Sequence, residues 1–143
     1  MPYADDCVFC KILQKQIPVV PVYEDDLVLA FLDIAPFNFG HTVVVPKDHH
    51  HSCTTLGGEY LARMMQVAPR IAAAIMRATE AEGFNLFLNN GSVAGQVVPH
   101  VHLHILPRFA HDGVLMTAST RKYATPQAMT DLAETIKQRV NHA

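Results

Sequence analysis

The sequence contains little cysteine and little net charge, and it lacks a long hydrophobic run. Three cysteines in 143 residues are too few for a disulfide framework. Two of them, Cys7 and Cys10, form a C-x-x-C pair, which in a reducing compartment is typical of metal or redox sites. No apolar run approaches the roughly 20 residues that a membrane helix needs. A net charge of -2 provides no basic surface for DNA, RNA or anionic lipid, so we expect neither nucleic-acid nor membrane partners.

The composition also excludes a disordered chain, because half of the residues are hydrophobic and only 17% are charged. No linker, repeat or low-complexity segment interrupts the sequence. The first six residues are acidic and lack the basic and apolar parts of a secretion signal. We therefore expect a single domain over residues 1–143 and a cytoplasmic location.

Three histidines alternate with branched apolar residues over residues 100–106, which read HVHLHIL. Successive side chains of a β-strand point to opposite faces, so His100, His102 and His104 are predicted on one face. Val101, Leu103 and Ile105 are then predicted in the core. A strand face that only had to be solvated could use Thr, Lys or Glu at lower cost. The pattern therefore indicates a functional site.

Hydrophobic periodicity predicts the remaining elements. A short helix is predicted over residues 7–14, strands over 19–23, 27–32, 41–45 and 84–88, and a long amphipathic helix over 58–82. Pro69 is predicted to kink the long helix and Gly83 to cap its end. A last helix is predicted to begin at Thr125 and Pro126. Strands with hairpin-length connections around one central helix predict an antiparallel α+β domain.

Several motifs accompany the histidines in a fixed order. They are CVFCKI at residues 7–12, AFLDI at 30–34, GHTVVVPK at 40–47 and the glycine-containing run NNGSVAGQ at 89–96. With the triad, they closely resemble the bacterial branch of the histidine triad (HIT) superfamily of nucleotide hydrolases and transferases, over about residues 5–109. The resemblance implies a HIT-like fold, in which one long helix packs across a five-stranded antiparallel sheet, with short N-terminal and C-terminal helices. It also implies a homodimer joined edge to edge, with residues 110–143 as a C-terminal extension that carries a helix.

The resemblance implies a hydrolase or nucleotidyl transferase that cleaves the α-phosphate bond of purine nucleotide conjugates. AMP-amine phosphoramidates and dinucleoside polyphosphates are both candidate substrates. The middle histidine, His102, would form a covalent nucleotidyl intermediate, because imidazole is a competent nucleophile near neutral pH. His100 and His104 would donate hydrogen bonds to the phosphate, and Gln96 to the phosphate or the leaving group. No cofactor is expected for catalysis, since imidazoles and backbone amides supply the charge stabilisation.

The same position-by-position match implies a nucleotide pocket. Asp33 would accept both ribose hydroxyls, and His41 would buttress the triad. Asn89 would reach the α-phosphate, and Gly95 would permit a close approach of backbone amides to it. The purine slot would be lined by Val8, Phe9, Ile12, Phe31 and Ile34. The expected partner is therefore a purine mononucleotide or one of its conjugates.

One position departs from the family pattern and keeps a second function open. Val97 stands where close relatives often carry a Ser or Thr whose hydroxyl can protonate or orient the leaving group. The alternative is a nucleotide-binding or scaffold protein with vestigial catalysis. A third interpretation of the triad face is a transition-metal site like those of double-stranded β-helix enzymes, although the upstream glycine loop is not part of that pattern.

The resemblance finally implies a structural zinc ion. Bacterial members with this C-x-x-C bind zinc through the two cysteines, the histidine of Pro-Lys-x-His and the first triad histidine. The neighbouring His50 and His51 leave the third ligand ambiguous by a residue or two. A closed tetrahedral site of this kind is expected to govern stability more than chemistry. The corresponding residues here are Cys7, Cys10, His49 and His100.

Overall fold

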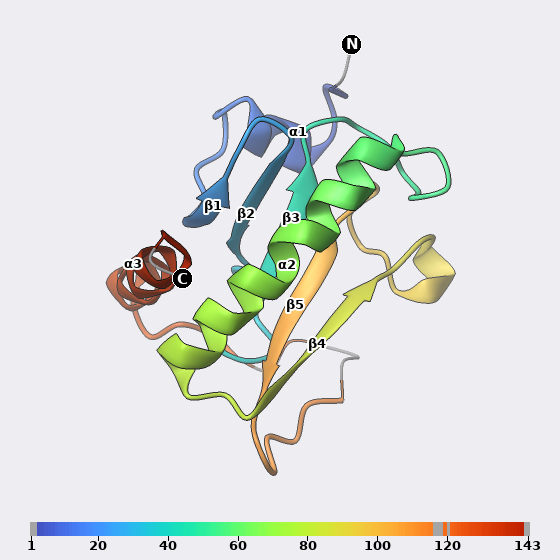
Figure 1. The fold of residues 1–143 in the computed structure, drawn as a ribbon. Helices are drawn as coiled ribbons and strands as arrows, with labels where there is room; N and C mark the ends of the chain where they lie inside the picture. Colours follow the sequence, from blue (N-terminus) through green and yellow to red (C-terminus); the bar gives the residue numbers. More distant parts are fainter. Residues whose placement is uncertain (1–2, 116–118, 120, 142–143) are drawn as a thin grey trace.

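A computed structural model describes residues 3–115, 119 and 121–141 of the chain. Its five strands form one antiparallel sheet in the order β1-β2-β3-β5-β4 (Figure 1). This confirms the predicted α+β class and the five-stranded sheet. The elements are α1 (Val8–Leu13), β1 (Pro21–Glu24), β2 (Val28–Leu32), β3 (Thr42–Pro46), α2 (Gly58–Thr79), β4 (Gly83–Leu88), the 3-10 turn η1 (Ser92–Ala94), β5 (Leu103–Arg108) and α3 (Pro126–Asn141).

The sheet is covered on both faces, which explains why every residue of β2 and β3 is buried. The long helix α2 crosses one face diagonally, and α3 lies on the same side near β1 (Figure 1). Val44 of β3 packs into the core under these two helices. Its neighbours Val43 and Val45 face the other way, into a smaller apolar cluster with Phe9 and Ile12 of α1. Strand alternation therefore builds two cores from one run of valines.

The triad segment joins the sheet later than the alternation predicts. The strand β5 begins at Leu103, because the backbone N–H of Val101 donates to the His50 carbonyl at 2.8 Å instead of entering the ladder. Only His104 therefore lies within a strand, where it is paired with Val43 of β3 and Phe87 of β4. The apolar alternates Val101, Leu103 and Ile105 do pack in the α2 core, as predicted.

The end of α2 also differs from the prediction. Glu80, with φ of 60°, takes the left-handed conformation that ends the helix, and Gly83 instead begins β4. The helix stays one element through Pro69. No helix among the described residues is both long enough and apolar enough to cross a lipid bilayer.

Candidate active site and metal-binding cluster

His102 is buried, and its proton position follows from one hydrogen bond. Its Nδ1 lies 2.8 Å from the backbone oxygen of His100. A carbonyl can only accept, so Nδ1 carries the proton and Nε2 keeps a free lone pair. Burial lowers the pKa of His102, although the His100 carbonyl opposes that shift. The residue is therefore held as the neutral tautomer that a nucleophile requires.

A second pair of hydrogen bonds fixes the proton of His104. The backbone N–H of Phe37 donates to Nδ1 of His41 at 3.1 Å, so His41 carries its proton on Nε2. That Nε2 lies 2.9 Å from Nδ1 of His104 and donates to it, which leaves the His104 proton on Nε2. Burial lowers the pKa of His41 to about 4 and that of His104 to about 3. His104 therefore offers one N–H for a ligand.

His100 has no nitrogen left for a phosphate. Its ring is fully buried, and Nε2 lies 3.1 Å from the Pro46 carbonyl, to which it must donate. Its Nδ1 points toward the cysteines, 3.5 Å from Sγ of Cys7. The backbone and the cysteine cluster engage both nitrogens of His100, so of the two histidines predicted to bracket a phosphate only His104 has a free N–H in this structure.

The cysteine cluster has the dimensions of a tetrahedral metal site. Sγ of Cys10 lies 3.3 Å from Nδ1 of His49, and the Nδ1 atoms of His49 and His100 lie 3.2 Å apart. Tetrahedral zinc with its usual bond lengths separates sulfur from nitrogen by about 3.6 Å and two nitrogens by about 3.3 Å. The donor atoms of Cys7, Cys10, His49 and His100 all lie within 4.8 Å of one another. The geometry is compatible with zinc, and His49 is the third residue of the group.

The surroundings of this cluster also suit thiolate ligands. Cys7 occupies the N-cap position of α1, where its Sγ accepts the backbone N–H of Cys10 at 3.4 Å. The backbone N–H of Ala4 donates to Sγ of Cys10 at 3.3 Å. Burial raises the pKa of the Cys10 thiol to about 11 without a metal. A bound metal cation would deprotonate both thiols, and the resulting thiolates would then act as its ligands.

Asp33, His41 and His104 form another group whose ligand atoms lie within 4.8 Å of one another. Its hydrogen bonds argue against a metal there. Ligation at Nε2 of His41 would move the proton to Nδ1, which faces the N–H of Phe37 and would then lose its hydrogen bond. In contrast, the second nitrogen of His100 donates to a carbonyl, as metal-ligating histidines usually do. The transition-metal interpretation of the triad face is thus disfavoured.

The predicted purine slot has a buried floor and an open edge. Phe9, Ile12 and Phe31 are 5–9% exposed and pack in the α1 cluster. Val8 and Ile34 are 39% and 83% exposed, so they offer apolar surface to a ligand. Phe9, Ile12 and Phe31 thus lie together on the α1 side of the sheet.

Asp33 lies next to this slot, at the end of β2. Its Oδ1 accepts the backbone N–H of Ala35 at 2.9 Å, and its Oδ2 lies 3.9 Å from Nε2 of His41. The side chain is 26% exposed. The carboxylate is thus oriented by its own loop and still has lone pairs that a ligand can reach.

The loop before the triad has the positive φ angles that its glycines permit, and the Gln96 side chain bonds to backbone groups. Gly91 and Gly95 have φ of 91° and 93°, and a Cβ at Gly95 would lie 3.2 Å from the Asn89 amide nitrogen. The Gln96 side chain accepts the N–H of Gly91 at 2.7 Å and donates to the His51 carbonyl at 2.8 Å. Gln96 therefore ties the loop together, and its predicted contact with the phosphate stays a prediction. Val97 is 89% exposed.

Two aromatic contacts near the triad were not predicted. Phe37 stacks on His41 with ring centroids 5.3 Å apart, and Phe87 stacks on His104 at 4.3 Å. The signal that could have found Phe87 is register: once β4 and β5 pair, it lies directly opposite His104. Sequence spacing alone does not give that register.

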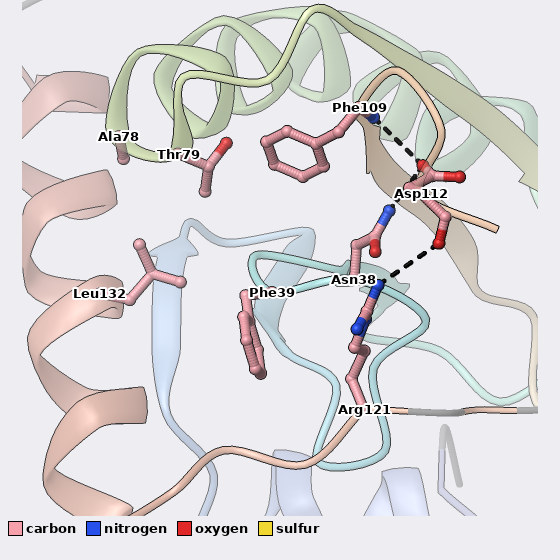
Figure 2. Close-up of a pocket in the computed structure, with 8 residues that line it drawn as sticks. All are labelled: Asn38, Phe39, Ala78, Thr79, Phe109, Asp112, Arg121 and Leu132. Atoms are coloured by element: carbon pink, nitrogen blue, oxygen red, sulfur yellow. Dashed lines mark hydrogen bonds between the residues drawn. The ribbon is translucent and has the colours of Figure 1, made fainter. Parts of the chain in front are cut away.

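A hollow of about 430 Å³ lies away from the imidazoles, between the end of α2, α3 and the loop before β3 (Figure 2). Its polar groups bond to one another: Asn38 donates to the Asp112 carboxylate at 2.9 Å, and Arg121 donates to the Asp112 carbonyl at 3.3 Å. A second hollow, of about 400 Å³, lies against Gly91, Gln96 and Val97. Among the described residues, no imidazole or thiol lines the first hollow, so the triad remains the candidate site for the chemistry. Its lining residues are Asn38, Phe39, Ala78, Thr79, Phe109, Asp112, Arg121 and Leu132.

Comparison with known proteins agrees with this geometry. The model of the HIT domain family matches residues 14–111. The chain is 36% identical to adenosine 5'-monophosphoramidase hnt1 of Schizosaccharomyces pombe over 134 residues, 94% of this chain and 98% of that protein. It is 40% identical to adenylylsulfatase HINT3 of Arabidopsis thaliana over 120 residues, 84% of this chain and 61% of that protein.

Solved structures show the same likeness. A zinc-bound histidine triad family protein from Mycobacterium smegmatis superposes with a TM-score of 0.84 at 35% identity, covering 96% of this chain and 94% of that one. Since the family model spans most of the chain and these relatives align along nearly all of it, the protein belongs to the histidine triad (HIT) superfamily.

Proposed function

We propose that the protein is a nucleotide hydrolase or nucleotidyl transferase that cleaves the α-phosphate bond of purine nucleotide conjugates through a nucleotidyl-His102 intermediate. Membership of the family supports nucleotide hydrolysis in general terms. The observation that carries the finer proposal is the hydrogen bond from Nδ1 of His102 to the His100 carbonyl, which frees Nε2 for attack. AMP-amine phosphoramidates, dinucleoside polyphosphates and adenylyl sulfate all present the same nucleotide half to this atom.

In the proposed reaction, Nε2 of His102 attacks the α-phosphorus. The bond from phosphorus to the leaving group breaks with its electron pair, and the leaving group takes a proton from water. A second water molecule then attacks the phosphorus and gives its proton to the hydroxide left by the first, the nitrogen–phosphorus bond breaks with its electron pair returning to Nε2, and the nucleoside monophosphate is released. Splitting one displacement into two in this way is the general advantage of covalent catalysis.

Charge that develops on the phosphate oxygens needs donors that are already in place. His104 supplies one, because the chain from Phe37 through His41 places its proton on Nε2. The N–H groups of Gly91 and Gly95 already donate within the loop, to Gln96 and Ser92, so other backbone amides of this loop are the remaining candidates. In this proposal no resident cofactor takes part in the chemistry.

The nucleotide half would bind along the slot described above. The Asp33 carboxylate would accept the ribose hydroxyls, and the exposed side chains of Val8 and Ile34 would close over a base that rests on Phe9. An apolar slot with one fixed polar group is the usual composition of a small-ligand site. We therefore propose a purine mononucleotide or its conjugate as the ligand.

We further propose that Cys7, Cys10, His49 and His100 hold one structural zinc ion, since their donor distances and burial fit that ion. When bound, zinc would stabilise the fold by fixing α1 against the start of the triad segment. The chemistry remains with His102 and His104, which are not among these ligands.

A homodimer through the sheet edge is also proposed. The edge strand β4 pairs with β5 on one side only, and none of its residues is fully buried. Phe84 on this strand is 39% exposed and Met65 on α2 is 53% exposed. A partly exposed apolar edge of this kind is a natural surface for strand pairing with a second copy.

Val97 favours a second candidate function, nucleotide binding with vestigial catalysis. Its exposed side chain has no hydroxyl with which to protonate a leaving group. Incubation with a fluorogenic adenosine phosphoramidate and with diadenosine polyphosphates separates the two functions. Release of AMP, with an adenylyl adduct trapped on His102 by acid-free quenching, supports the hydrolase. AMP binding without turnover of either substrate supports the alternative.

A further inference from the structure

Phe87 lies against the triad from the edge strand β4. It is directly opposite His104 in the antiparallel register, and the two rings are 4.3 Å apart with planes only 10° from parallel. His104 also contacts the ring of His102, with centroids 4.7 Å apart and planes at 64°. The ring of His104 thus contacts both a parallel phenyl ring and the candidate nucleophile.

The surroundings of Phe87 distinguish it from an ordinary core residue. Its strand neighbours Leu86 and Leu88 pack against the α2 core, whereas Phe87 belongs to neither of the apolar clusters found among the described residues. It is half-buried, and the ring contact that the structure gives it is the one with His104. The contact with His104 is therefore what this aromatic side chain provides.

The stack restrains a motion that the hydrogen bond to His104 leaves open. The bond from Nε2 of His41 fixes where Nδ1 of His104 lies, at 2.9 Å. The ring can still tilt about that contact, and a tilt swings the N–H at Nε2 on the opposite side of the ring. A flat aromatic neighbour opposes the tilt, because offset stacked rings lose contact area and quadrupole attraction when they rotate.

We propose that Phe87 is a positioning residue for the known family reaction, which fixes the ring plane of His104 and so aims its Nε2–H at the phosphate. This inference rests on the proposed function of His104 as a phosphate donor. Phe87 touches neither substrate nor reacting atoms in this proposal and acts through His104. It is a feature of this chain's edge strand rather than of the triad motif.

The test compares Phe87→Leu with Phe87→Tyr and with Phe109→Leu, a control at a half-buried phenylalanine outside the triad and the sheet edge. Leucine keeps most of the apolar volume and removes the flat face, while tyrosine keeps the face. In Phe87→Leu we expect kcat for an adenosine phosphoramidate to fall about three- to tenfold with KM within about twofold, since the donor matters most in the transition state. Phe87→Tyr and Phe109→Leu should retain near-normal kcat.

A second readout does not depend on activity. Nitrogen-15 NMR of the His104 ring should show one sharp Nε2–H signal in the parent protein and exchange broadening of that signal in Phe87→Leu, at unchanged overall fold by circular dichroism. An unchanged His104 spectrum in Phe87→Leu overturns the proposal, as does a loss of kcat that tyrosine fails to rescue. If the parent protein turns over none of the substrates, the proposed function fails, and the NMR comparison still decides whether Phe87 positions His104.

Discussion

Proton positions in the histidine network are set by backbone groups rather than by the imidazoles themselves. The carbonyls of Pro46 and His100 can only accept, and the N–H of Phe37 can only donate. These three contacts determine which nitrogen of His100, His102 and His41 carries a proton. These contacts leave one free lone pair on His102 and one free N–H on His104. Attack on a phosphate needs at least these two groups, a nucleophile and a donor.

Replacing His102 by Asn should reduce turnover by several orders of magnitude while AMP affinity stays within about tenfold. The nucleophile contributes mainly after ground-state binding, so its loss lowers kcat rather than raising Kd. Steady-state kinetics and calorimetric AMP titration measure the two quantities. His111→Asn is the matched control, because His111 is exposed and its φ of 60° is one that Asn tolerates. Near-normal turnover in His102→Asn would contradict the assignment.

Replacing Asp33 by Ala should weaken nucleotide binding about tenfold to a hundredfold, since two charge-assisted hydrogen bonds to the ribose are lost. The ratio of affinities for AMP and 2'-deoxy-AMP should fall toward one. Asp33→Asn keeps an acceptor for the Ala35 N–H and so controls for damage to the loop. If the ribose preference survives in Asp33→Ala, the carboxylate does not read the ribose.

The sequence predicted which residue types gather at the site, but it did not predict the direction in which each side chain points. His100 and Gln96 were both predicted to contact a phosphate, and both are engaged elsewhere. The competing partners are backbone groups of Pro46, Gly91 and His51, which lie 5 to 54 residues away in the sequence. A motif records which residues are present, whereas hydrogen-bond competition from distant backbone decides what each one binds.

At the level of elements, the short helix α1 depends on the cysteine cluster for its place. A helix of six residues is too short to be stable alone, and its apolar side packs only a small cluster. Cys7 at its N-cap and Cys10 within it face His100, whose carbonyl in turn holds His102. The cysteine cluster and the candidate nucleophile therefore both involve His100, the first through its side chain and the second through its backbone carbonyl.

The double variant Cys7→Ser/Cys10→Ser should lose its zinc and melt at least about 10 °C lower, because structural zinc supplies several kcal/mol to a fold of this size. Elemental analysis of protein purified without a histidine tag and thermal unfolding provide the measurements. Cys53→Ser, which alters a cysteine outside the cluster, should change neither quantity. Substoichiometric zinc in the parent protein, or an unchanged melting temperature in the double variant, would end the zinc proposal.

Element types were predictable from periodicity, while several boundaries were not. The strand β5 starts at Leu103 rather than at His100 because Val101 bonds to His50, a partner that no local pattern indicates. Glu80 ends α2 in a left-handed conformation that a glycine would adopt more readily. In both cases a specific backbone partner or conformation outweighs the intrinsic preference of the residue.

For the molecule as a whole, the sequence predicted the fold class and the sheet, and the order β1-β2-β3-β5-β4 came from the structure. That order places the triad segment between β3 and the edge strand β4, so His104 receives one neighbour from each side, Val43 and Phe87. Topology thereby creates contacts, such as the Phe87 stack, that belong to no motif in the sequence.

The stability of the whole fold should fall as the pH drops below about 6.5. In the unfolded chain His41 and His104 protonate near their ordinary pKa, whereas burial lowers the folded pKa values to about 4 and about 3. Between these limits the unfolded state binds more protons, so each residue reduces the free energy of unfolding by up to about 1.4 kcal/mol per pH unit of acidification.

Urea unfolding at pH 7 and pH 5 measures this dependence, and His104→Gln isolates one of its sources. The parent protein and the His104→Gln variant contain the same cysteine cluster. Any release of zinc by acid therefore affects their stabilities equally and cancels in the comparison. Glutamine does not titrate, and we expect the loss of stability between pH 7 and pH 5 to be about 1–2 kcal/mol smaller in the variant. An equal loss in the two proteins would mean that His104 is not held neutral in the fold, and would remove the basis for its role as a fixed N–H donor.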